Sequence, residues 1–154
     1  MYRVSRYQTD LNLYRKEQKQ MTRNEAREHM MQIMYEMDAA KTMNRETAVR
    51  LADERLQGNH KKRGEDLICS IIDDLDEIDK RINASSRSWT TSRMPKVDLA
   101  IMRLAVGEIM YGDSSSVPAA VAINEAIDLA KKYSTERSSK FIHGVLGAIV
   151  KSNE

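Results

Sequence analysis

Apolar residues recur at helical spacing in the middle of the chain, and this stripe limits the possible folds more than any other feature. Its members are Ile68, Ile71, Ile72, Leu75, Ile78 and Ile82. Spacings of three and four residues place these side chains on one face of an α-helix. Acidic residues crowd the other side (Asp73, Asp74, Asp76, Glu77 and Asp79). Because a helix of this kind must bury its apolar face against other elements, the stripe predicts a packed helical domain.

The same periodicity in other segments predicts an all-α chain. We expect further helices from the Thr22 cap to about residue 37, over 45–57, from Pro95 to 111, from Pro118 to about 130, and over 136–151. Thr22 and Glu25 have the spacing of a capping box, which satisfies free N–H groups at a helix start. The polar stretch 83–94, which contains Trp89, is interpreted as a connection, and a short helix that packs the indole is the alternative. Gly144 and Gly147 are expected to permit close helix approach.

Composition excludes several classes of protein. The chain has 154 residues, enough for one domain with a single core, and a formal net charge of +2. Cys69 is the only cysteine, so no internal disulfide can form, and we interpret it as a core residue. The three histidines lie in separate segments, so we expect neither a metal site nor a cofactor. No signal peptide or membrane-spanning run is visible, which favours a cytoplasmic location without membrane association.

Three blocks in the last third carry a family resemblance: VDLAIMRLA at 97–105, INEAIDLAK at 123–131 and KFIHGVL at 140–146. Together with Ala26-Arg27-Glu28 in the first helix, their order and spacing resemble the bacterial NusB family of transcription antitermination factors. The resemblance implies an all-α bundle of about seven helices, arranged as two packed three-helix subdomains or as one domain. It extends from Met21 to residue 154, which leaves residues 1–20 as an N-terminal extension.

The resemblance also implies a function. NusB proteins pair with the small-subunit ribosomal protein NusE, and the heterodimer binds the single-stranded boxA element of leader RNA within the transcription complex, which supports ribosomal RNA synthesis. NusB-like domains also precede the catalytic part of RNA methyltransferases, but this chain has no Gly-rich S-adenosylmethionine loop, so we expect no enzyme. A helical protein-interaction module, or a self-associating homodimer without RNA binding, is the alternative.

The resemblance suggests residues for RNA contact. Arg23 and Arg27 match positions of the family's arginine-rich stretch, in which this chain has fewer arginines than usual. Lys140 and Phe141 match positions near RNA, and Arg137 stands where a relative has an acidic residue. For Phe141, packing in the core is the alternative to base stacking. The arginines that flank Trp89, Arg87 and Arg93, are further candidates.

The N-terminal extension, residues 1–20, is a second possible source of RNA affinity. Its five basic residues outnumber its two acidic ones, a net charge of +3, so the remainder of the chain sums to −1. These cations would supplement Arg23 and Arg27 if the extension belongs to the protein. A mis-assigned start near Met21 is the alternative.

A different surface is expected to meet the protein partner. Tyr35 and Asp98 match family positions that face NusE, and the acidic side of the central stripe would attract a basic ribosomal protein. An ordinary solvated face is the alternative for those acidic residues. Glu125 is expected to steady a nearby cation such as Lys131 or Arg103. His143 replaces the usual asparagine of the family, which puts any contact made through that amide in doubt.

Overall fold

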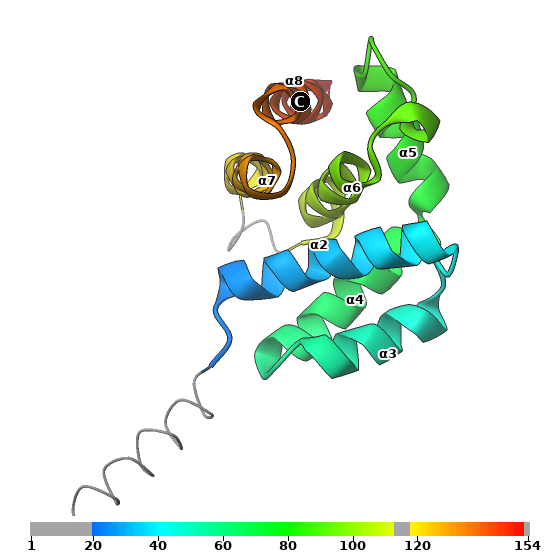
Figure 1. Cartoon of the computed structure of the whole chain (residues 1–154), viewed down its shortest axis with the longest axis vertical. Coiled ribbons are helices and arrows are strands. Elements are labelled where there is room, and N and C mark those ends of the chain that lie inside the picture. Colours follow the sequence, from blue (N-terminus) through cyan, green and yellow to red (C-terminus); the bar gives the residue numbers. More distant parts are fainter. Residues whose placement is uncertain (1–19, 113–117, 153–154) are drawn as a thin grey trace, which may run out of the picture.

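Every regular element that the structure describes is a helix (Figure 1). The structure is a computed structural model, and it describes residues 20–112 and 118–152. The elements are α2 (Arg23–Ala40), α3 (Arg45–Arg55), α4 (Asn59–Asp73), α5 (Leu75–Ser85), the 3-10 helix η1 (Thr91–Arg93), α6 (Lys96–Tyr111), α7 (Ala119–Tyr133) and α8 (Glu136–Ser152). The predicted all-α class is confirmed. None of these helices is long and apolar enough to cross a membrane.

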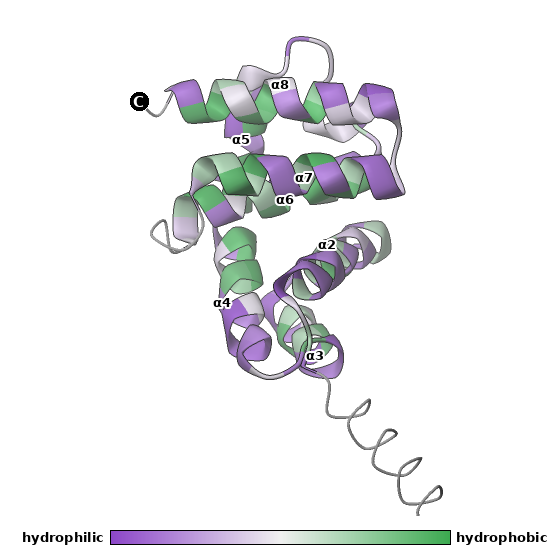
Figure 2. Ribbon diagram, turned by 90° about the vertical axis from the view of Figure 1, so that its left-hand side faces the viewer, coloured by the Kyte–Doolittle hydropathy of each residue, from purple (hydrophilic) through white to green (hydrophobic). Residues whose placement is uncertain are grey.

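Helix α6 lies at the centre, with three helices on either side (Figure 1). Helices α2 and α4 contact α6 from one side and carry α3, while α5, α7 and α8 contact it from the other. Every residue from Asp98 to Glu108 is consequently buried. The outer helices are amphipathic, with polar residues on their outward sides (Figure 2). The arrangement fits the two three-helix groups predicted from the resemblance.

Polar residues on the buried helix α6 are paired. Arg103 donates to the Asp79 carboxylate of α5 through Nε and Nη2, at 2.9 and 2.7 Å. Its Nη1 lies 3.7 Å from the Asp38 carboxylate of α2. Since a buried unpaired charge is costly, these carboxylates allow Arg103 to lie inside and to join three helices.

The start of α2 forms one half of the expected capping box. Thr22 is extended, and its side chain accepts a hydrogen bond from the Glu25 backbone N–H at 3.1 Å. The Glu25 carboxylate accepts from the Thr22 hydroxyl rather than from backbone. From this start the helix buries Ile33, Met34 and Met37 of the predicted stripe.

The central apolar stripe is divided between two helices, which the periodicity did not predict. Helix α4 ends at Asp73, α5 begins at Leu75, and Asp74 between them has φ −112° and ψ 25°. Both halves contact α6, but their other neighbours differ, because α4 packs on α3 whereas α5 packs on α8. Because the chain changes direction at Asp74, one continuous apolar pattern packs against both sets of neighbours. Cys69, on the α4 half, is a buried core residue as predicted.

Close helix approach occurs at Gly107, not at the two glycines expected to provide it. A Cβ atom at Gly107 would lie 2.3 Å from Cγ1 of Ile71, so glycine is needed where α6 crosses α4. A Cβ atom at Gly144 or Gly147 would meet nothing within 4 Å. The expectation for Gly144 and Gly147 was therefore wrong, because these positions lie on the outer side of α8.

Candidate nucleic-acid and partner-binding surfaces

Arg27, one of the residues expected to contact RNA, lies in the interior. Its side chain is 4% exposed, and its Nε donates to Glu108 at 2.9 Å while Nη2 donates to the other oxygen of the same carboxylate. Its Nη1 lies 3.4 Å from the Glu125 carboxylate. These contacts join α2 to α6 and α7, and the cation next to Glu125 is Arg27 rather than the expected Lys131 or Arg103. Arg27 thus holds α2 against α6 and α7.

Burial and ion pairing act in opposite directions on Arg27. Loss of water lowers the pKa of its guanidinium, but the hydrogen bond and negative charge of Glu108, with a further contribution from Glu125, outweigh that effect and raise the pKa above its usual value. Arg27 therefore remains protonated in the folded protein.

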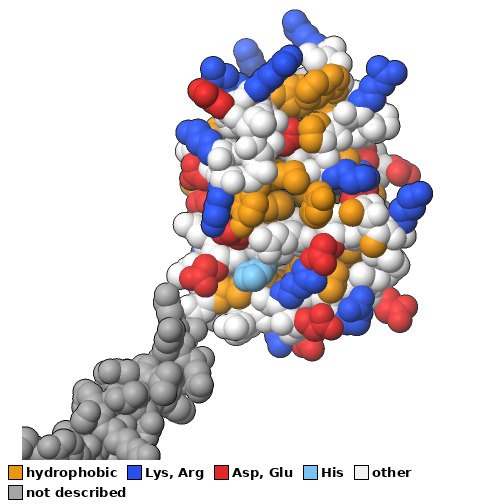
Figure 3. Space-filling model, viewed as in Figure 1, with side chains coloured by type: hydrophobic (Ala, Val, Ile, Leu, Met, Phe, Trp, Pro, Cys, Tyr) orange, Lys and Arg blue, Asp and Glu red, His pale blue; other side chains and the backbone are white. Residues whose placement is uncertain are grey.

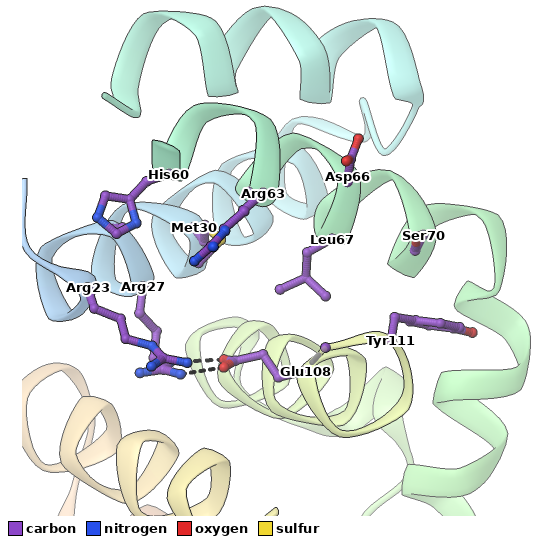
Figure 4. A pocket seen from close by; sticks show the side chains of 13 residues that line it. Arg23, Arg27, Met30, His60, Arg63, Asp66, Leu67, Ser70, Glu108 and Tyr111 are labelled. Atoms are coloured by element: carbon purple, nitrogen blue, oxygen red, sulfur yellow. Dashed lines mark hydrogen bonds and ion pairs between the residues drawn. The ribbon is translucent and has the colours of Figure 1, made fainter. Parts of the chain in front are cut away.

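Arg23 is exposed at the first residue of α2, beside a hollow between α2, α4 and the end of α6 (Figure 4). The hollow has a volume of about 370 Å³ and is also lined by His60, Arg63 and Tyr111. Sequence reasoning did not identify His60 or Arg63, although the run Lys61-Lys62-Arg63 was a signal. In that run, Lys61 pairs with Asp53 and Lys62 with Asp66, whereas Arg63 faces the hollow. Arg23 and Arg63 thus form a basic rim.

The beginning of α8 brings Arg137, Lys140 and Phe141 to the surface. Arg137 is exposed, Phe141 is half-buried, and Lys140 is 79% exposed, with its Nζ 3.9 Å from the Glu136 carboxylate. The Phe141 ring lies edge-to-face with Trp89 from the loop before η1, with ring centroids 5.5 Å apart. The Phe141 ring is therefore partly packed against the protein and partly exposed to solvent. His143 is exposed, so it lies on the outer side of the same helix.

Asp98, expected to face a protein partner, is fully buried. Its two carboxylate oxygens accept hydrogen bonds from the hydroxyls of Ser134 and Ser138, each at 2.7 Å. The carboxylate therefore fastens the turn between α7 and α8 to the first turn of α6. It has no exposed surface for direct contact with a partner.

Tyr35 remains available to a partner. Its side chain is 38% exposed on the outward face of α2. One turn earlier, Gln32 donates to the Tyr133 hydroxyl at 3.2 Å, and Lys132 pairs with Glu28 at 2.7 Å. The face around Tyr35 consequently continues onto the end of α7.

The acidic side of the divided stripe is partly used within the chain. Asp73 pairs with Arg45, Asp79 with Arg103, and Asp74 accepts a hydrogen bond from the Tyr111 hydroxyl. Desolvation and the Asp74 carboxylate raise the pKa of Tyr111 to about 12. The attractive field predicted for this side is therefore partly neutralised within the chain. Four of the five acidic residues remain exposed, which fits the alternative of an ordinary solvated face.

Comparison with known proteins identifies the family. A sequence profile described as the NusB family matches residues 24–151. The chain belongs to the NusB family. Transcription antitermination protein NusB of Thermoanaerobacter sp. (strain X514) is 40% identical, over 85% of this chain and 91% of that protein. The NusB protein of Finegoldia magna is 34% identical, over 87% of this chain and 97% of its own length.

Solved structures share the fold. NusB of T. maritima superposes with a TM-score of 0.77 at 28% identity and covers 86% of this chain and 93% of its own. A crystal structure of antitermination factors NusB and NusE in complex with dsRNA gives a TM-score of 0.71 at 26% identity, over 84% and 96% of the two chains. The predicted family and its fold are thus confirmed, and the chain is a NusB transcription antitermination protein from a non-enzymatic family.

Proposed function

We propose that this NusB protein binds boxA RNA of ribosomal RNA leaders together with NusE, and that the complex supports ribosomal RNA transcription. Family membership supports the general role. A structural neighbour holds NusB, NusE and RNA in one crystal structure, which supports the choice of partners. Self-association without RNA binding is the competing outcome that the experiments below distinguish.

One observation carries the RNA part of the proposal. Arg137, Lys140 and Phe141 are brought together on the first turns of α8, where the two cations are exposed and the ring is accessible. Cations bind phosphates and an aromatic ring can stack on an unpaired base, which is the combination that single-stranded RNA requires. Arg23 adds a cation at the start of α2, whereas Arg27 supports that helix from inside.

A titration tests RNA binding. A labelled boxA RNA and a scrambled control are titrated with the protein, with and without NusE, at two salt concentrations. We expect tighter binding of boxA, a further gain with NusE, and weaker binding at higher salt because protein cations displace counterions from phosphates. Equal affinity for both RNAs in every condition would contradict the proposal, and a dimer that binds neither RNA nor NusE would favour self-association.

The NusE surface is tested at Tyr35. Truncation by Tyr35→Ala is expected to weaken NusE binding by about tenfold or more, because interface tyrosines often carry more than about 1.4 kcal/mol of binding free energy. Val49→Ala on α3 is the matched control, since Val49 is 39% exposed and Tyr35 is 38% exposed. Calorimetric titration of NusE into each variant gives the comparison. If both variants bound NusE with equal affinity, Tyr35 would not be part of the NusE interface.

A further inference from the structure

Trp89 and Phe141 form an aromatic pair at the surface of the α8 side. Their ring planes are inclined by 61° with centroids 5.5 Å apart, so the edge of one ring meets the face of the other. Trp89 is 38% exposed, and Phe141 is half-buried. Exposed hydrophobic side chains also lie among Lys and Arg side chains at this end of the molecule (Figure 3). The pair thus leaves a large part of the indole open to a ligand.

The loop that carries Trp89 is held by local hydrogen bonds. The Ser86 hydroxyl donates to the Trp89 carbonyl and accepts from the Trp89 N–H. Asn83, on the last turn of α5, accepts from the Thr91 N–H at 2.8 Å. Because these bonds fix the backbone on both sides of the indole, Trp89 has less conformational freedom to lose when a ligand binds.

Exposed cations lie close in sequence to both members of the aromatic pair. Arg137 stands four residues before Phe141, which places the two side chains on the same face of α8. Lys140 is next to Phe141, and Arg87 and Arg93 lie within four residues of Trp89; all three cations are exposed. Glu136 lies 3.9 Å from Lys140, and both of those side chains are largely solvated. The local charge therefore favours a polyanion with flat apolar groups.

We propose that Trp89 stacks on a base of the single-stranded RNA, with Phe141 supporting the indole and the neighbouring cations holding phosphates. This inference rests on the proposed function and adds a residue to its RNA surface. Single-stranded RNA fits because its unpaired bases can leave their neighbours and lie on an aromatic ring. A duplex keeps its bases stacked inside, so it would not reach the indole in this way.

Trp89 is the only tryptophan in the chain, so its fluorescence reports this contact directly. The protein is titrated with a short boxA RNA, and binding is followed separately by the anisotropy of a dye on the RNA. We expect the indole emission to be quenched with the same midpoint as the anisotropy change, since a stacked base contacts the fluorophore. The same RNA annealed to its complement is the control, and it is expected to quench little.

Variants separate stacking from packing. Stacking on an aromatic side chain contributes about 1–3 kcal/mol per base, so Trp89→Leu is expected to weaken RNA binding by about fivefold to about a hundredfold. Trp89→Phe keeps an aromatic face and should retain most of the affinity. Stacking involves no counterion, so the salt dependence should be the same for Trp89→Leu and the unmodified protein, whereas Lys140→Ala should make it shallower. Circular dichroism checks that each variant is folded.

The outcomes distinguish this inference from the function on which it rests. RNA binding without quenching, together with full affinity in folded Trp89→Leu, would overturn the stacking role of Trp89 and leave the RNA function standing. Absence of any specific RNA binding in the anisotropy measurement would overturn both. Quenching together with loss of affinity in Trp89→Leu but not in Trp89→Phe would establish the stacking role.

Discussion

The beginnings of α2 and α8 both carry basic residues that the family resemblance connects with RNA, but the two regions use them differently. On α2, Arg27 turns inward and binds Glu108 and Glu125. On α8, Arg137 and Lys140 face solvent beside an aromatic pair. The difference shows that a basic residue at a position which the resemblance connects with RNA can instead form an ion pair in the interior. Which cations reach the ligand depends on the carboxylates that other helices bring against them.

The largest effect is expected from breaking the interior pair. Arg27→Met removes a buried cation and leaves Glu108 uncompensated, which typically costs about 3–5 kcal/mol of unfolding free energy. Urea unfolding followed by circular dichroism measures this loss. The double variant Arg27→Met/Glu108→Leu should recover much of the stability, because both charges of the closest pair are gone. A single variant as stable as the unmodified protein would show that Arg27 is not the interior residue described.

A smaller loss is expected at the fastening of α8. Asp98→Asn keeps the shape but removes the charge that accepts two hydroxyl hydrogen bonds, so we expect a loss of about 2 kcal/mol in unfolding free energy. Asp128→Asn on the exposed side of α7 is the control and should change stability by less than about 0.5 kcal/mol. Equal unfolding midpoints for the two variants would mean that Asp98 does not hold the α7–α8 turn.

Arg137 tests the surface side of the comparison. Arg137→Ala should change the unfolding free energy by less than about 0.5 kcal/mol. If its guanidinium binds one phosphate of single-stranded RNA, the slope of log affinity against log salt should become shallower by about 0.7. Arg50→Ala on α3, at an arginine 62% exposed, should leave the slope unchanged. An unchanged slope for Arg137→Ala would remove Arg137 from the RNA surface.

The smallest effect concerns the surface contact between Tyr111 and Asp74. The folded state raises the pKa of Tyr111 from an ordinary value near 10 to about 12, so it holds the phenol proton more tightly than the unfolded chain does. The resulting stabilisation is present below about pH 10 and is lost as the pH rises toward 12. Urea midpoints of the unmodified protein and Tyr111→Phe should therefore converge over that interval. If the difference between the two urea midpoints stayed constant over that interval, folding would not raise the pKa of Tyr111, and the contact with Asp74 would not stabilise the phenol proton.

The helices could be predicted from sequence because the spacing of apolar residues in each helix shows which face is buried. The pattern could not reveal the break at Asp74, since a stripe gives the face of a helix but not the direction of the neighbours that cover it. Burial of Arg27 was beyond the sequence for a related reason. Its partner Glu108 lies 81 residues away, and nothing local to α2 marks the contact.

The candidate site was predicted only in part. The start of α8 was proposed because Lys140 and Phe141 stand in the motif at 140–146 and Arg137 precedes it by one turn. Asp98 was assigned to the surface because nothing in the surrounding motif indicates its hydrogen-bond partners. These partners, Ser134 and Ser138, lie 36 and 40 residues further along the chain. Trp89 and Phe141 are 52 positions apart by the printed numbering, so only the fold brings the rings together.

Helix α6 has a consequence for how the molecule opens. All residues from Asp98 to Glu108 are covered by neighbours on both sides, so water cannot reach their backbone amides while the two groups of helices remain closed around them. Amide hydrogens in this segment should exchange with deuterium only when the whole domain unfolds. Their exchange rates would thus report the global equilibrium, while those of α3 would report local fluctuations at the edge.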